Sequence, residues 1–184
     1  MAKMKNKNLN LDHSDTINYK GEVKVVYTKN NKNRTLKKKN SGHIGLYTFL
    51  TRSLAGYSVD KYRPCRVMLY TKDKTDNTRY YEILTQPINY GVTPVLLNNG
   101  EQTDASKNDC VQYTFIIPAS IVKSDFKSSK TYINKITLFN SFPTNDTNDD
   151  ISKCAEITFD SELEVSSTNM IIYWNLSFSS QGEE

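Results

Sequence analysis

Few residues of this chain could take part in acid–base or metal chemistry. The 184 residues include two histidines, His13 and His43, and three cysteines, Cys65, Cys110 and Cys154. His13 lies in a polar stretch rich in Lys and Asn, and His43 stands at the start of an expected helix, where packing or hydrogen bonding is its ordinary role. The cysteines are odd in number and far apart, which argues against a disulfide framework and against a zinc site. Cys110 and Cys154 fall at or beside expected strands and are predicted core residues.

Catalytic motifs are absent from the sequence. It contains no Ser-His-acid arrangement, no P-loop and no Gly-rich dinucleotide turn. Residues 146–150 place oxygen ligands at alternate positions, like the start of a calcium loop. However, Ile151 stands where that loop needs its turn glycine, and no Glu follows at the required distance. We therefore expect an ordinary acidic turn here, and a chain that is not an enzyme and uses no metal or cofactor.

Three consecutive lysines, Lys37, Lys38 and Lys39, are the candidate interaction residues. On a short edge strand they would discourage pairing with foreign edges, and on an exposed surface they could contact DNA phosphates. The 12 tyrosines raise a second question, because aromatic faces stack on sugars and bases. Four of them fall on expected strands: Tyr70, Tyr113, Tyr132 and Tyr173. Tyrosine is a normal strand residue, so these positions favour structure over ligand binding.

The charge of the chain is unevenly distributed. The formal net charge is +4, but residues 1–72 carry 16 Lys/Arg and 4 Asp/Glu (net +12), and residues 73–184 carry 8 and 16 (net −8). Solvated loops explain this most simply. Docking between copies, positive edge to negative edge, is the next interpretation, and a nucleic-acid surface is the least favoured.

The segment from Cys154 to Phe178 shows which elements must position these side chains. Met170, Ile172, Trp174 and later residues are apolar at every second position, which is typical of one face of a β-strand. Before them, residues 155–159 and 163–165 also alternate, with Asp160-Ser161 and residues 166–169 as turn material. The pattern predicts an antiparallel meander with one apolar face.

The remaining sequence predicts further short strands and one helix. The expected strands cover residues 22–28, 35–39, 63–70, 80–85, 92–97, 110–117 and 132–139. Residues 92–97 contain Pro94 and suit only a sheet edge. An amphipathic helix is expected near residues 43–55, capped by Asn40 or Ser41, with Leu46, Tyr47, Leu50 and Leu54 on one face and Gly56 as its stop. The fold class is therefore mainly β, an antiparallel β-sandwich (jelly-roll or immunoglobulin-like) of about eight or nine strands.

The domain organisation is simple. Residues 1–19 are expected to be a flexible N-terminal arm, residues 20–180 one β-sandwich domain, and residues 181–184 a short tail. The loops at 71–79, 98–109 and 140–151 are polar. No run of about 18 apolar residues is present, so no membrane helix is expected, and the N-terminus lacks the apolar core of a secretory signal. Synthesis in a cytoplasm is expected.

Three sequence blocks together resemble a known class of proteins. They are residues 38–56 followed by Arg63-Pro64, residues 133–141, and residues 155–160 with 163–165 and 170–178. In this order they are similar to small β-sandwich structural proteins of tailed bacteriophages, including podovirus-like and crAss-like phages. Such proteins often have Asn-Gly or Asn-Thr-Gly near the helix start, where this chain has Asn40-Ser-Gly-His43.

The resemblance implies a virion component made in a bacterial host cytoplasm. The leading expectation is a multi-copy neck or tail ring or adaptor protein near the portal, a homo-oligomer with portal, tail or capsid proteins as partners. The first alternative is a capsid decoration or head-fibre module whose loops at 71–79 and 98–109 contact a host glycan. The second is a packaged, DNA-associated protein that uses Lys37, Lys38 and Lys39.

Overall fold

The β-branched and aromatic residues of this chain form strands along most of its described length. The computed structural model describes residues 17–29, 32–76, 78–97, 110–127, 131–141, 149–164 and 170–180. The strands are β1 (Ile17–Lys29), β2 (Lys32–Gly42), β3 (Arg66–Lys72), β4 (Tyr80–Glu82), β5 (Ile88–Asn89), β6 (Val92–Leu97), β7 (Cys110–Ile117), β8 (Tyr132–Phe139), β9 (Lys153–Glu164) and β10 (Met170–Ser180). The helices are α1 (Ile44–Leu54), α2 (Ser124–Lys127) and α3 (Asp149–Ser152), beside a 3₁₀ turn at Ala119–Ile121. None of these helices is long and apolar enough to span a membrane.

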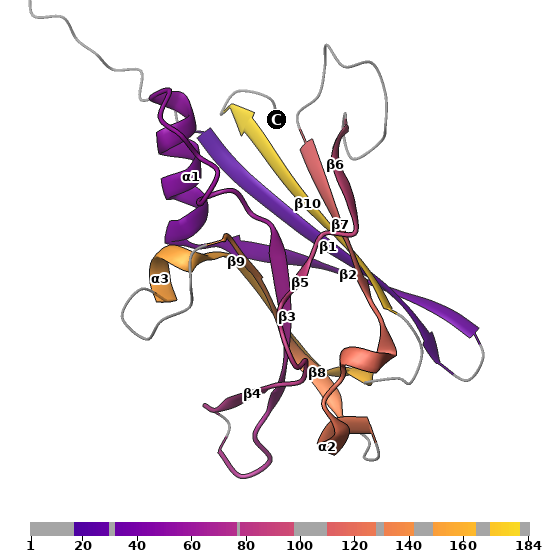
Figure 1. Ribbon diagram of the computed structural model, residues 1–184. Helices are drawn as coiled ribbons and strands as arrows, with labels where there is room; N and C mark the ends of the chain where they lie inside the picture. The colour runs from indigo at the N-terminus through magenta and orange to yellow at the C-terminus, as the bar shows by residue number, and fades with distance from the viewer. Residues whose placement is uncertain are drawn as a thin grey trace, which may run out of the picture.

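The strands form two antiparallel sheets (Figure 1). Sheet A has the order β2-β1-β10-β7-β6, and sheet B the order β4-β3-β8-β9, with β5 also paired to β3. Strand β2 joins the two: residues 32–40 pair with β1, whereas Ser41 and Gly42 pair with Glu156 and Ala155 of β9. The predicted mainly-β antiparallel sandwich is confirmed, and the described residues form ten strands where eight or nine were expected.

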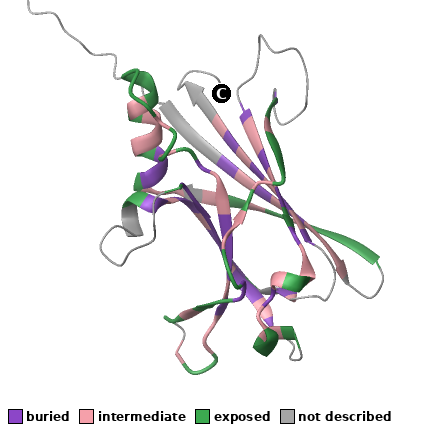
Figure 2. Cartoon of the chain, in the orientation of Figure 1, coloured by how far each residue is buried: buried purple, intermediate pink, exposed green. Residues whose placement is uncertain are grey.

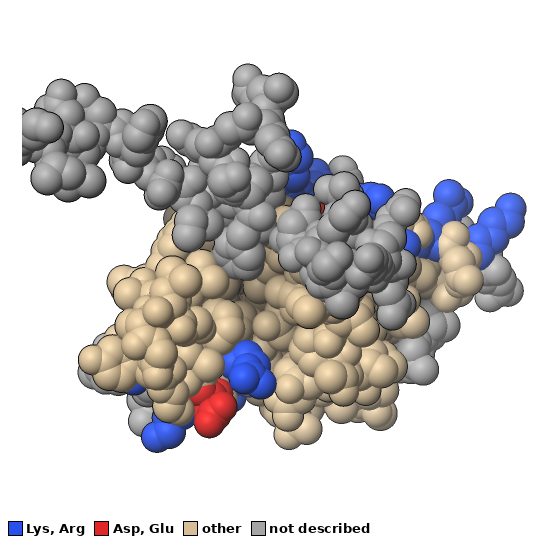
Figure 3. All heavy atoms as spheres, turned by 90° about the horizontal axis from the view of Figure 1, so that it is seen from above, with Lys and Arg blue, Asp and Glu red and all other residues tan. Residues whose placement is uncertain are grey.

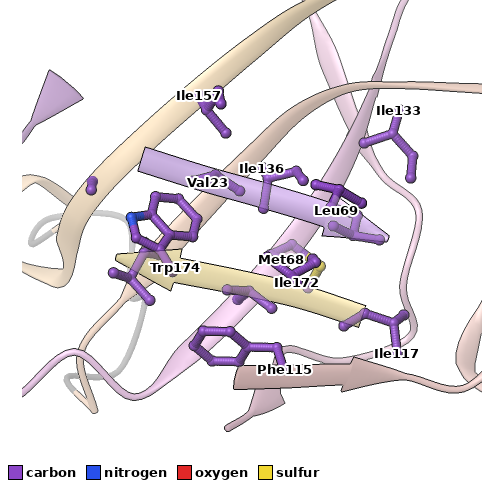
Figure 4. Close-up of a cluster of buried hydrophobic side chains, with 14 of the residues drawn as sticks. Val23, Met68, Leu69, Phe115, Ile117, Ile133, Ile136, Ile157, Ile172 and Trp174 are labelled. Carbon is purple, nitrogen blue, oxygen red and sulfur yellow. The ribbon is translucent and has the colours of Figure 1, made fainter. Parts of the chain in front are cut away.

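The core lies between the two sheets and draws on both. Trp174 and Ile172 of β10, Phe115 of β7, Leu69 of β3 and Ile136 of β8 are almost fully buried in one apolar cluster (Figure 4). Each such side chain contributes roughly 1.5–3 kcal/mol on full burial. Figure 2 shows buried residues along the strands, with exposed residues on α1, along β6 and at the end of β2.

The predicted terminal meander is wrong in its pairing. Strands β9 and β10 both carry the expected alternation, but they lie in different sheets: β9 pairs with β8 and β2, and β10 pairs with β1 and β7. The alternation depends only on which face of a strand is buried, so it is the same whichever strand is the neighbour.

The expected turn at Asp160-Ser161 is also absent, because β9 continues through it. The register between β8 and β9 shifts there: Ile133 pairs with Leu163, and Lys135 pairs with Thr158. The extra residues on β9 form a bulge. Residues that favour turns also occur at such bulges inside a sheet. Buried Asn134 lies at the bulge, where its Nδ2 donates to the Phe159 carbonyl at 3.4 Å and its Oδ1 accepts from the Lys72 N–H at 2.9 Å.

Helix α1 is confirmed, but its cap and its buried face differ from the prediction. The N-cap is His43, without a side-chain cap bond, because Ser41 and Gly42 are still in β2. Leu46 is fully buried and Leu50 half-buried, but Tyr47 and Leu54 are exposed. The helix ends at Leu54, and the expected stop residue Gly56 follows its C-cap with a φ of 72°, the left-handed conformation that glycine adopts most easily.

Strand β6 is the edge strand that Pro94 predicted. It pairs with β7 alone among the described strands, and its register shifts between Val92 and Val95, on either side of the proline. The missing N–H of Pro94 is tolerated at such an irregular edge. Elsewhere β3 runs on to Lys72, two residues beyond its expected end, and β4 is shorter than expected. The loop expected at 140–151 contains α3.

The first strand begins earlier than expected. Strand β1 starts at Ile17, which pairs with Ser180, so three residues assigned to the arm by sequence lie in sheet A. Residues 1–16, the loop at 98–109 and the tail at 181–184 lie outside the described residues.

Candidate functional site

The outer face of sheet B is hollowed into a groove with a volume of about 490 Å³. Side chains on this face alternate with core side chains, so β3 and β8 present the cross-strand pairs Met68–Thr137 and Tyr70–Lys135 to it. The groove is lined by Met68, Tyr70, Tyr80, Glu82, Thr85, Gln86, Pro87, Lys135, Thr137, Phe139 and Lys153. Met68, Thr137 and Phe139 are each less than 5% exposed and form its least accessible part.

Lys135 is the most constrained charged residue of the groove. Its Nζ lies 4.2 Å from the ring centroid of Tyr80 and 4.6 Å from that of Tyr70, both within cation–π range. It also lies 3.7 Å from Oε2 of Glu156, and the Thr137 hydroxyl donates to the same oxygen at 3.3 Å. The side chains of Lys135 and Glu156 are only 16% and 23% exposed, so solvent screens this pair less than an ordinary surface ion pair.

The groove combines charges of both signs with apolar surface. Lys135, Lys153 and Glu82 line it, Glu156 lies beside Lys135, and Glu82 also lies 3.7 Å from Nζ of Lys123. The lining includes no His, Cys or Ser. It offers hydrogen-bond donors and acceptors around a partly apolar floor, which is the usual composition of a binding site.

The loop beside the groove is fixed by Asp73. Its carboxylate accepts from the Tyr81 hydroxyl at 2.6 Å, from the N–H and hydroxyl of Thr75 at 2.7 Å each, and from the N–H of Asp76 at 3.1 Å. These hydrogen bonds, that of Tyr81 above all, hold the pKa of the Asp73 carboxyl far below its usual range. The same contact raises the pKa of the Tyr81 hydroxyl.

Replacing Asp73 by asparagine is therefore expected to reduce stability in a pH-dependent way. A carboxyl whose pKa is lowered in the folded chain stabilises it above the ordinary Asp pKa of about 3.9, and that contribution declines as the pH falls below this value. Denaturant unfolding of parent and Asp73→Asn near pH 7 and near pH 3 measures the difference. The difference in the free energy of unfolding between the parent and the variant should be smaller near pH 3 than near pH 7. A difference that is the same at both pH values would mean that the charge of Asp73 contributes nothing to stability.

The three lysines predicted as interaction residues divide between two faces of β2. Lys37 and Lys39 are exposed on the same face as Lys24 and Glu22 of β1, whereas Lys38 points the other way and is half-buried. Nζ of Lys37 lies 3.9 Å from Oε1 of Glu22, an exposed ion pair that contributes at most about 1 kcal/mol. Figure 3 shows Lys and Arg side chains gathered at the end of the molecule where the β1–β2 hairpin projects. The run of three is thus not one continuous patch.

His43 and the three cysteines lie in the described part of the chain, and their contacts are those of structural residues. His43 is the N-cap of α1, and its backbone N–H donates to the Cys154 carbonyl at 2.9 Å. Cys110 and Cys154 are buried, which confirms them as core residues. Burial raises the pKa of the Cys154 thiol strongly and that of Cys65 to a lesser degree, where Arg66 opposes the effect. In the part of the chain that the structure describes, no group of three His, Cys, Asp or Glu could hold a metal ion.

Sequence reasoning located the tyrosines but not the groove. Tyr70, Tyr113, Tyr132 and Tyr173 all lie on strands, as predicted, and burial raises the pKa of Tyr113 strongly. The available signal was the polar face of residues 132–139, where Lys135 and Thr137 alternate with core residues. That face gains its partners Tyr80 and Glu156 only through strand pairing, which the pattern does not specify. The acidic run at 146–150 lies mostly outside the described residues.

Comparisons with protein-family models, with curated proteins and with solved structures find no match to this chain.

Proposed function

We propose that this chain is a non-enzymatic structural protein of a tailed-bacteriophage virion, which assembles in many copies into a ring or adaptor at the neck or tail near the portal. The observation that carries the assembly is a pair of exposed apolar patches on different elements, here named the α1 patch and the β6 patch. Monomeric soluble proteins rarely expose contiguous apolar patches larger than a few hundred Å².

The α1 patch follows one face of the helix. Ile44, Tyr47 and Leu54 are spaced at i, i+3 and i+10, which places them on one side of α1, and Tyr57 follows the helix end. All four are more than half exposed, and Leu54 is 78% exposed. The opposite side of α1 supplies Leu46 to the core, so these four side chains remain available for an external partner.

The β6 patch lies at the free edge of sheet A. Val92 and Val95 of β6 are exposed on one face of the sheet together with Ile116 of the neighbouring β7, and Leu96 is exposed on the other face of the same edge. Strand β6 contains no charged residue, and on its outer side it pairs with no described strand. Apolar edge strands without charges readily accept another chain, and Pro94 is the only protective residue in this one.

Two different patches on one subunit suit a head-to-tail contact. Figure 1 shows α1 and β6 apart from each other at the same end of the molecule, with β1 and β10 between them. A contact between the α1 patch of one copy and the β6 patch of the next leaves one free patch at each end, and the chain of contacts closes into a ring if the rotation permits.

The placement in a virion is supported by the three sequence blocks that resemble phage β-sandwich proteins, and by a stiff sandwich with exposed edges. In the decoration or head-fibre alternative, the same patches would contact the capsid. In the DNA-associated alternative, Lys24, Lys37 and Lys39 on the β1–β2 hairpin would face phosphate groups.

Light scattering coupled to size-exclusion chromatography tests the proposed assembly. The parent chain should form a larger, concentration-dependent oligomer, and Leu54→Glu and Leu96→Glu should each give monomers, because each removes one side of the contact. An equimolar mixture of the two variants should give a dimer, since each still offers one intact patch. Thr158→Glu, at an exposed position of β9 outside both patches, is the matched control and should behave like the parent.

Three outcomes would contradict head-to-tail assembly. They are a parent chain that is monomeric at every soluble concentration, variants that still assemble, and a mixture that remains monomeric. A closed trimer that depends on only one of the two patches would instead favour the head-surface alternative.

A further inference from the structure

We infer that the groove on the outer face of sheet B is a binding site for a neutral carbohydrate. The site is separate from the α1 and β6 patches and shares no residue with them, so this inference does not depend on ring assembly. Three properties of the groove lead to this ligand class. Charges of both signs are mixed in it, Lys135 and Glu156 are fixed close together, and two tyrosine rings form its walls.

The charges of the groove select against ionic ligands. Lys135 and Lys153 line the groove together with Glu82, while Glu156 lies beside Lys135 and Lys123 lies beside Glu82, so charges of both signs are mixed. An anion such as a phosphate would be attracted by the lysines but repelled by the two carboxylates. A cation would be attracted by the carboxylates but repelled by the lysines. A purely apolar ligand would bury Lys135 and Glu156 further without offering them hydrogen bonds, which is costly. A neutral ligand rich in hydroxyl groups meets none of these penalties.

The pair of Lys135 and Glu156 matches two neighbouring hydroxyl groups. Their charged atoms are 3.7 Å apart, longer than a hydrogen bond, so both can still bond to a ligand. The ammonium group donates to one hydroxyl oxygen, and the carboxylate accepts from the other hydroxyl. The Thr137 hydroxyl bonded to Glu156 and the two rings beside Lys135 fix the pair before a ligand arrives. Such charge-assisted bonds to a vicinal diol are strong because the groups are already ordered.

The tyrosines provide the apolar part of the same recognition. Tyr70 and Tyr80 both line the groove and are both half-buried, so part of each ring faces the open space. The C–H face of a pyranose ring packs on an aromatic ring while its hydroxyls point to the rim. Met68 and Phe139 supply further apolar contact below.

Saturation-transfer NMR on the full chain tests the inference. The probes are the methyl glycosides of glucose, galactose, mannose, rhamnose and N-acetylglucosamine, with glucuronic acid and glucose 6-phosphate as anionic comparators. At least one neutral glycoside should receive saturation from the protein, and its affinity should fall about tenfold or more in Tyr80→Ala. Glu156→Gln should weaken binding as well, because it removes the charged acceptor but keeps the shape of the side chain.

Tyr81→Ala is the matched control. Tyr81 is the next residue along β4, is 48% exposed and bonds to Asp73, but does not line the groove. This variant should bind like the parent. The inference is overturned if no neutral glycoside receives saturation from the folded parent, if the anionic comparators bind more tightly, or if Tyr80→Ala and Tyr81→Ala weaken binding equally. Far-ultraviolet circular dichroism of each variant separates loss of the site from loss of the fold.

Discussion

Replacing Trp174 by alanine is expected to lower the free energy of unfolding by about 3–5 kcal/mol. Trp174 is completely buried, pairs with Val23 of β1 and Tyr113 of β7, and has the largest side chain in the core. Its removal leaves a cavity between the sheets that the surrounding strands can fill only in part. Since small domains are stable by only about 5–15 kcal/mol, this substitution should remove a large part of the total free energy of unfolding.

Two companion variants show whether burial is the cause. Tyr173→Ala, on the outer face of the same strand, removes only a stacking contact with Lys24 at 5.5 Å and should change stability by less than about 1 kcal/mol. Trp174→Phe should cost roughly 1–2 kcal/mol, because the indole N–H has no hydrogen-bond partner among the described residues and little besides volume is lost. Urea unfolding followed by circular dichroism suits this series, because Trp174 is the only tryptophan. An alanine variant as stable as the parent would mean that the face assigned to β10 is wrong.

Replacing Gly45 by alanine should destabilise the chain by about 1–3 kcal/mol, although alanine is the better helix former. A Cβ at this position would overlap the backbone carbonyl oxygens of Ile151 and Lys153, which cannot move as a side chain can. Helix α1 must then shift away from α3 and β9, and Leu46 loses its place in the core. Helix propensity alone predicts the opposite sign, which makes the measurement decisive.

Denaturant unfolding and limited proteolysis near α1 would measure this effect together. Gly91→Ala is the matched control, because its new Cβ would meet only the flexible side chain of Ile116, at 3.3 Å and beyond. Its stability should stay within about 1 kcal/mol of the parent. A Gly45→Ala variant with raised stability would show that α1 does not pack against these carbonyl groups.

The sequence was sufficient for helix α1, for most of the strands and for the buried faces of those strands, because these depend on neighbouring residues. The alternation at Met170, Ile172 and Trp174 predicts a strand with that face inward, and all three are buried. Pro94 predicts an edge strand because a proline cannot donate to a second neighbour. Gly56 predicts the helix end because few other residues adopt its backbone conformation.

Strand partners and the groove could not be predicted in the same way. The turn-forming pair Asp160-Ser161 suits a hairpin and a bulge equally, and the choice depends on Asn134 of β8, which is distant in sequence. The cap residues expected for α1 are used by β2, which continues to pair with β9. The groove requires Tyr80, Lys135 and Lys153 from three strands, and their meeting is a property of the whole topology.

The ladder between β1 and β10 has a consequence for how the chain is made. It joins residues from Ile17 to Val26 with residues from Ser180 back to Ile171, so the middle of sheet A is built from segments near the two ends of the sequence. A ribosome must release β10 before this sheet can form, whereas the β1–β2 hairpin can form early. Folding of such a long-range arrangement is slow, and the edge of β7 that pairs with β10 stays unpaired until β10 has been synthesised.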